Sequence, residues 1–142
     1  MTLITKSPAY ARLSAATLLL AALSTGAAFA ADIKVTLSGT NEVPPVTTSA
    51  SGGGTIMVSN EGSVTGGVTT MGVAGTAAHI HEGAPGKNGP VIVPLVKEGD
   101  AYKVPAGAKL TEAQMASFKA GNLYINVHSA ANPGGEIRGP LK

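Results

Sequence analysis

All three histidines of this 142-residue chain lie in two short segments, and their spacing suits the binding of a metal ion. His79 and His81 are separated by one residue, so in an extended strand both imidazole rings point to the same face of the sheet. His128, in the second segment, could complete a set of three nitrogens if the two strands lie side by side. Because neutral imidazole is a good ligand for copper and zinc, the sequence predicts a copper site, with zinc as the alternative metal.

Other side chains in or near these two segments could complete or support such a site. Glu82, Glu136 or a water molecule could supply a further ligand. Tyr124, Asn126 and Glu136 are candidates for orienting the rings, because they fall on the strand of His128 or on a nearby strand. A structural alternative stays open, in which the histidines only hydrogen-bond the carbonyl groups of neighbouring glycine- and proline-rich loops.

The elements that must position these residues are short β-strands punctuated by glycine and proline. Each strand is marked by alternation of apolar and polar residues or by a run rich in valine, isoleucine and threonine. A turn at residues 59–62 is predicted to join two of them as a hairpin. The expected strands cover residues 33–37, 55–58, 64–71, 91–96, 123–128 and 135–139.

Two of the expected strands have a clear inward face. In the strand over 123–128, the side chains that should face the core are Leu123, Ile125 and Val127. In the strand over 135–139, Ile137 should point inward and its flanking charges, Glu136 and Arg138, outward. Glu42 and Arg138 could form a partly buried ion pair that ties the N-terminal loop to this last strand.

A single helix interrupts the β pattern. Thr111 is a good N-cap, Gln114 follows three residues later, and Gly121 provides a stop, so a helix is predicted from about residue 112 to about residue 120. Met115 and Phe118 should anchor it in the core. Many short strands, frequent turns and one helix predict a mostly β fold, a small antiparallel Greek-key-like β-sandwich or barrel.

The first 30 residues have the pattern of a secretory signal peptide. Lys6 and Arg12 are the only charged residues there, an apolar run covers 13–23, and Ala28-Phe29-Ala30 is a small-x-small cleavage site. We therefore expect cleavage after Ala30, which leaves residues 31–142 as a single domain without a membrane span. A transmembrane helix is the alternative, but the apolar stretch is short, rich in alanine and broken by small polar residues.

Charge and cysteine content exclude several functions. The chain has 10 basic and 8 acidic residues, and without Lys6 and Arg12 the expected domain has 8 of each and is formally neutral. Binding to nucleic acid or to an anionic membrane therefore has no electrostatic basis. The absence of cysteine rules out disulfides, thiolate metal sites and a cysteine nucleophile. We expect a periplasmic or secreted protein.

The sequence contains no pattern that identifies a catalytic site, so an enzymatic function is left open and disfavoured. Ser129 follows His128 directly, which does not make a catalytic triad, and the aspartates of the domain, Asp32 and Asp100, have no catalytic motif around them. A zinc ion held by histidines with an open position could activate water in principle. Nothing in the sequence marks a substrate pocket for such a reaction.

Several motifs follow one another along the expected domain. They are Asn41-Glu42-Val43-Pro44-Pro45-Val46, Ala77-Ala78-His79-Ile80-His81-Glu82-Gly83, Asn88-Gly89-Pro90-Val91, and Asn126-Val127-His128 with Asn132-Pro133-Gly134-Gly135-Glu136-Ile137-Arg138-Gly139. Together they resemble the CHRD domain, the module named after chordin, over nearly all of residues 31–142. The resemblance implies an exported, mostly β domain that occurs in bacterial secreted proteins and, as repeats, in the extracellular protein chordin. It implies no particular biochemical activity.

A second, shorter resemblance concerns the histidines. His79-Ile80-His81-Glu82 is similar to the His-Val-His-Glu strand that supplies two copper ligands in copper/zinc superoxide dismutases, which are Greek-key sandwiches exported by many bacteria. The chain lacks the cysteines and the later histidine and aspartate series of that family. The resemblance therefore argues against dismutase activity and leaves a single copper-type site open.

Two functions from different classes remain. In the first, the protein is an exported binding protein that holds copper, or zinc, through His79, His81 and His128. In the second, it is a structural or adhesion module of the cell envelope or extracellular matrix that holds no metal and binds an unidentified protein there. The sequence specifies neither the partner nor the oligomeric state.

Overall fold

The computed structural model describes residues 29–142, which form nine β-strands, a short 3-10 turn and one α-helix. All strand pairs are antiparallel, so the predicted mostly β, antiparallel fold with one short helix is confirmed. The predicted signal peptide, residues 1–30, lies outside the described residues except for its last two positions. Within 29–142, no helix is both long enough and apolar enough to cross a membrane.

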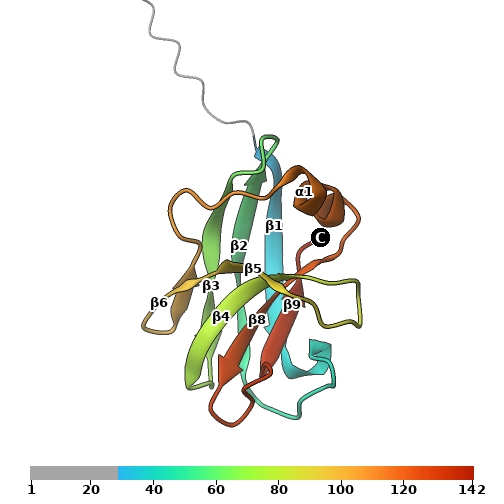
Figure 1. Ribbon diagram of the computed structural model, residues 1–142. Helices are drawn as coiled ribbons and strands as arrows, with labels where there is room; N and C mark the ends of the chain where they lie inside the picture. Colours follow the sequence, from blue (N-terminus) through green and yellow to red (C-terminus); the bar gives the residue numbers. More distant parts are fainter. Residues whose placement is uncertain (1–28) are drawn as a thin grey trace, which may run out of the picture.

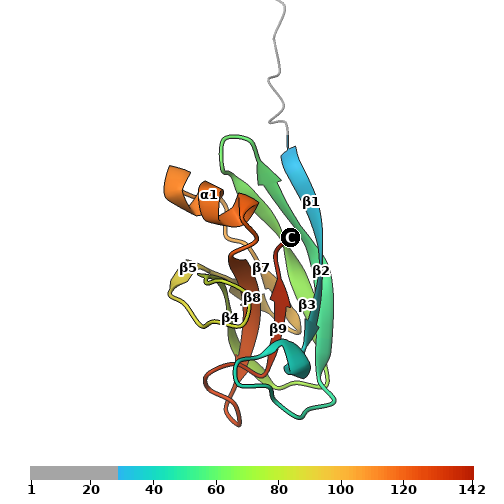
Figure 2. The same cartoon turned by 90° about the vertical axis from the view of Figure 1, so that its right-hand side faces the viewer.

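The strands form one sheet that curls into two facing layers. Figures 1 and 2 show β1, β2 and β3 on one side and β4, β5 and β8 on the other. The order across the sheet is β5-β4-β8-β9-β1-β2-β3-β7-β6. The strand bounds are β1 (Phe29–Ser38), β2 (Ser51–Ser59), β3 (Val64–Met71), β4 (Gly75–Glu82), β5 (Val91–Pro94), β6 (Val96–Glu98), β7 (Ala101–Lys103), β8 (Leu123–Ser129) and β9 (Ile137–Pro140).

The chain itself brings the two edges of the sheet together. The run predicted as one strand over 91–96 is in fact divided between β5, which pairs with β4, and β6, which pairs with β7 at the opposite edge. Pro94 ends β5 because it has no backbone N–H to donate. The next residue, Leu95, donates its N–H to the carbonyl of Ala78 in β4 at 2.9 Å. The sheet is therefore a nearly closed barrel (Figure 1).

The core lies between the two layers and contains the residues that strand alternation predicts. Ile80 of β4 is 1% exposed, so it points inward between the two histidines as expected. The predicted inward residues of the other strands are also buried: Ile33, Val35, Leu37, Leu123, Ile125, Val127 and Ile137.

Strand β2 is longer than the sequence predicted, because the glycine run at 52–54 belongs to it. Gly54 lies so close to β3 that a Cβ there would overlap the carbonyl oxygen of Gly67. Glycine is therefore a packing requirement at this position, although its low β propensity argues against a strand.

The predicted helix is α1 (Glu112–Lys119), which ends one residue before the expected position. Thr111 and Gln114 form the expected capping box, and the anchors Met115 and Phe118 are buried. Ser117 of this helix donates a hydrogen bond to the carboxylate of Glu82 at the end of β4.

The outer face of β8 and β9 is not open to solvent, which corrects the prediction that the charges of the last strand point outward. Glu136 and Arg138 are both buried, with Arg138 only 5% exposed. Loops cover this face: Asn41 donates to the backbone carbonyl of Arg138, and Asn88 donates to the carbonyl of Val43. The polar side chains on this face therefore lie beneath a second layer of loops.

Candidate metal centre

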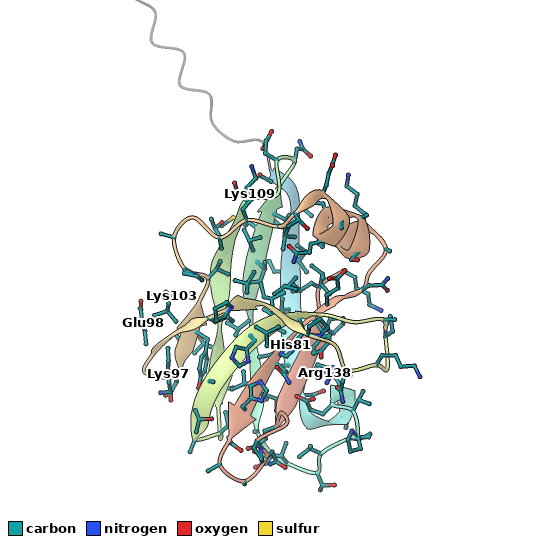
Figure 3. The ribbon with its side chains drawn as sticks, in the orientation of Figure 1. His81, Lys97, Glu98, Lys103, Lys109 and Arg138 are labelled. Atoms are coloured by element: carbon teal, nitrogen blue, oxygen red, sulfur yellow. The ribbon has the colours of Figure 1, made fainter. Side chains whose placement is uncertain are left out.

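The three histidines lie on the loop-covered side of two neighbouring strands. In the antiparallel register of β4 and β8, His79 is opposite Asn126, His81 is opposite Tyr124, and Ala77 is opposite His128. His128 is therefore diagonal to His79 on the same face. Figure 3 shows His81 and Arg138 close to this part of the barrel, well away from Lys97 and Lys103 near β6 and β7.

The predicted three-histidine group is brought together by this register. One ring nitrogen of each histidine can be chosen so that all three lie within 4.8 Å of one another. Nδ1 of His79 and Nε2 of His128 are 3.0 Å apart. Within residues 29–142, this is the group of histidine and carboxylate side chains whose spacing could hold a metal ion.

Backbone carbonyl groups orient two of the rings. Nδ1 of His81 lies 2.9 Å from the carbonyl oxygen of Gly89, and Nδ1 of His128 lies 2.9 Å from that of Pro133. A carbonyl oxygen can only accept, so each Nδ1 carries the hydrogen and the lone pair of each neutral ring is on Nε2. Nε2 of His81 is buried and has no hydrogen-bond partner among the described residues.

The ring of His79 completes the group, and its hydrogen can lie on either ring nitrogen. Because Nε2 of His128 has the lone pair, Nδ1 of His79 is the donor in the 3.0 Å contact between the two rings. If the hydrogen of His79 moves to Nε2, its Nδ1 also becomes a ligand atom. Burial is the main cause that lowers the pKa of both His79 and His81, with nearby histidines contributing, so the neutral, metal-binding form is favoured.

Tyr124 supports His81 from the neighbouring strand, as the sequence suggested. The two rings stack with their centroids 4.8 Å apart and their planes 5° apart. The hydroxyl of Tyr124 accepts a hydrogen bond from the N–H of Gly89, whose carbonyl binds His81. The guanidinium of Arg138 lies 3.9 Å from the centre of the Tyr124 ring. Because β8 lies between β4 and β9, His81 and Arg138 hold Tyr124 from opposite sides.

The predicted ion pair between Glu42 and Arg138 is confirmed. Nε of Arg138 lies 3.0 Å from Oε2 of Glu42, and the two side chains are 6% and 2% exposed. Arg138 also donates to the carbonyl of Lys87 and to the side-chain oxygen of Asn88. The pair thus joins both covering loops to β9.

The two carboxylates considered as extra ligands are not brought to the histidines. Glu82 points to the opposite face of β4, where it binds Ser117. Glu136 accepts hydrogen bonds from Ser129 and from Thr48, and these bonds lower its pKa. Of the side chains considered as supports, Tyr124 and Asn126 adjoin the histidines, whereas Glu136 connects β9 to the N-terminal loop.

Sequence reasoning considered loop carbonyls as partners of the histidines but did not identify which carbonyls orient the rings, because these are backbone atoms. The carbonyls of Gly89 and Pro133 belong to motifs that were visible in the sequence, Asn88-Gly89-Pro90 and Asn132-Pro133-Gly134. Proline next to a histidine motif signals a fixed loop, but the sequence does not show which carbonyl faces which ring.

The fold and this group define an antiparallel β-barrel domain with an all-histidine cluster on one loop-covered face. The CHRD domain family matches residues 33–141, which is nearly the whole of the described chain. The protein therefore belongs to the CHRD domain family, whose members are typically extracellular binding modules. Neither the curated proteins nor the solved structures contain a match to the chain.

Proposed function

We propose that this protein is an exported CHRD-domain protein that binds one copper ion through His79, His81 and His128. The observation that carries the proposal is the convergence of three imidazoles, two of them already fixed by backbone carbonyls with the lone pair on Nε2. Such fixing of the outer ring nitrogen is typical of histidines that bind metals. The proposed location is the periplasm or the exterior of the cell, reached after cleavage of the signal peptide at Ala30.

Copper is preferred to zinc because of the ligand set. All three donors are imidazole nitrogens, and for a given nitrogen site the affinity for Cu(II) exceeds that for Zn(II). Zinc sites often include thiolate or carboxylate ligands, but the chain has no cysteine and its nearby glutamates bind elsewhere. Zn(II) is therefore expected to bind more weakly to the same three side chains.

Calorimetric titration of the metal-free purified protein with Cu(II), Cu(I) and Zn(II) tests the proposal. We expect one Cu(II) per chain, and replacing any one of the histidines by alanine should lower the affinity by more than about 100-fold, beyond the effect typical of groups that only orient a ligand. The matched control is Glu82→Gln, because Glu82 adjoins His81 in sequence but faces α1. This variant should bind Cu(II) like the wild type.

A structural or adhesion module is the second candidate, and one observation favours it. His81 and His128 already bind the carbonyls of the covering loops, so they could order those loops without a metal. In that case the wild type would bind Cu(II) no better than the triple alanine variant. The histidine substitutions would then act only by lowering the thermal stability of the metal-free protein.

A further inference from the structure

Asn126 occupies the centre of the polar face that carries the histidines. Its strand neighbours in the register are His79 on β4 and Arg138 on β9. The side chain is only 1% exposed. An asparagine in such a position must have partners for its amide, because burying an unpaired polar group is costly.

The surroundings determine which way the amide points. Nδ2 of Asn126 donates to the carbonyl oxygen of Gly134 at 3.3 Å. Oε1 of Glu42 lies on the same side, since a Cβ at Gly135 would overlap both this oxygen and Nδ2 of Asn126. The carbonyl of Gly134 accepts from the nitrogen end, and Oε1 of Glu42, which has no hydrogen-bond partner within the described residues, lies nearby, so the hydrogens belong to that end and Oδ1 is directed away from Glu42.

The oxygen end of the amide faces the histidines and has no partner there. Oδ1 of Asn126 and Nε2 of His81 are both buried, and neither has a hydrogen-bond partner within residues 29–142. Burial lowers the pKa of His81, whereas a side-chain hydrogen bond with Asn126 is among the causes that raise it, so the two side chains lie within reach of one another. That bond requires a proton on Nε2 of His81. With His81 neutral, both atoms are acceptors, so they cannot satisfy one another.

We propose that the metal site has a fourth ligand whose donor atom carries hydrogen, a water molecule in the resting protein, and that Oδ1 of Asn126 accepts a hydrogen bond from it. The inference rests on the proposed metal binding. A metal ion on Nε2 of His81, with a water bound to the same ion, satisfies both unpartnered atoms at once. Glu82 and Glu136 do not compete for this fourth position, because their carboxylates accept hydrogen bonds elsewhere. Glu82 accepts from Ser117, and Glu136 accepts from Thr48 and Ser129.

This arrangement makes the fourth position selective. An anion without hydrogen, such as azide, would place its lone pairs against Oδ1 of Asn126 and would forfeit the hydrogen bond that water makes. Nearby Glu42 brings a carboxylate to the same polar layer, although Arg138 is paired with it. Asn126 is thus a positioning residue that favours water over such anions.

Two measurements on the Cu(II)-loaded full-length purified protein test this inference. Pulsed electron paramagnetic resonance in H2O and D2O should detect a strongly coupled exchangeable proton on a copper-bound water in the wild type. In Asn126→Leu, which removes the acceptor at similar volume, azide should bind about 3- to 10-fold more tightly than to the wild type, which corresponds to the loss of one hydrogen bond.

The matched control is Glu82→Gln, which changes a polar side chain next to His81 in sequence that binds Ser117 and not the site. It should leave the azide affinity unchanged. The inference is overturned if the wild type lacks the exchangeable proton, or if folded Asn126→Leu binds azide like the wild type. Failure of the proposed function has a different signature, because the wild type would then bind no Cu(II) and both proposals would fall.

Discussion

At the scale of single residues, the histidine cluster is oriented by groups that have no charge. Carbonyl oxygens accept from Nδ1 of His81 and of His128, so the Nε2 lone pairs of both rings point toward the centre of the proposed metal site. Burial also disfavours the protonated rings. The cost of this arrangement is that a buried ring nitrogen and an amide oxygen are left without partners in the described chain.

Acidification should therefore destabilise the metal-free protein. Burial lowers the pKa of His79 and His81 from the ordinary value of 6.5, so the unfolded chain takes up protons that the folded protein does not. The contribution to stability is fully present above pH 6.5 and is lost as the pH falls from there toward the lowered values. Urea unfolding in the presence of a chelator, at pH values on both sides of 6.5, measures it.

The control for this pH dependence is His81→Gln, which replaces a titrating side chain by a neutral polar one. Its free energy of unfolding should fall less steeply between neutral and mildly acidic pH than that of the wild type. Equal slopes for the two proteins would show that burial of His81 does not control its protonation.

At the scale of elements, loops are as important to the site as strands. The loop between β8 and β9 supplies the carbonyl of Pro133 to His128 and the carbonyl of Gly134 to Asn126. The loop before β5 supplies the carbonyl of Gly89 to His81. The ion pair of Arg138 with Glu42, and its bonds to the loop before β5, hold these covering segments together.

Two adjacent glycines of the β8–β9 loop provide a test of this packing. Gly135 has φ of 132°, and a Cβ there would overlap Glu42 and Asn126, whereas a Cβ at Gly134 would meet nothing within 4 Å. Gly135→Ala should lower the free energy of unfolding by about 2–4 kcal/mol through strain and overpacking. Gly134→Ala should change it by no more than about 1 kcal/mol in either direction.

Chemical denaturation of the two variants distinguishes these effects. Equal stabilities would mean that the Glu42 and Asn126 side chains can move aside, and that the polar layer is not rigid. A large loss confined to Gly135→Ala would show that the loop, the ion pair and the site residue Asn126 form one packed unit.

The elements that were predictable from sequence are those whose pattern is local. The alternation in β8 and the capping residues Thr111 and Gln114 specify a strand and a helix without reference to the rest of the chain. Burial of Arg138 was anticipated only through its ion pair with Glu42, and burial of Glu136 was not predictable in this way, because Thr48, which binds it, comes from a distant part of the sequence. For the same reason, the division of residues 91–96 between two sheet edges depends on where β4 and β7 lie.

At the scale of the whole molecule, the site lies on the interior strands of the sheet. β4 and β8 are each paired on both sides, whereas β5 and β6 form the two ends of the strand order. The connection of these ends through Leu95, whose N–H donates to the carbonyl of Ala78, leaves the barrel nearly closed. The proposed metal site on β4 and β8 is therefore carried by strands that are paired on both sides, while the ends of the sheet can open separately.

Native-state hydrogen exchange of the metal-free protein should reveal this difference. Amides of Ile125 and Val127 in β8 are fully buried and should exchange only through global unfolding. Amides of β6, whose residues are all exposed, should exchange through local opening with a smaller free energy and little dependence on denaturant. If β6 is instead protected as strongly as β8, the barrel opens only as a whole, and its closure at Leu95 contributes as much to stability as the pairing of the interior strands.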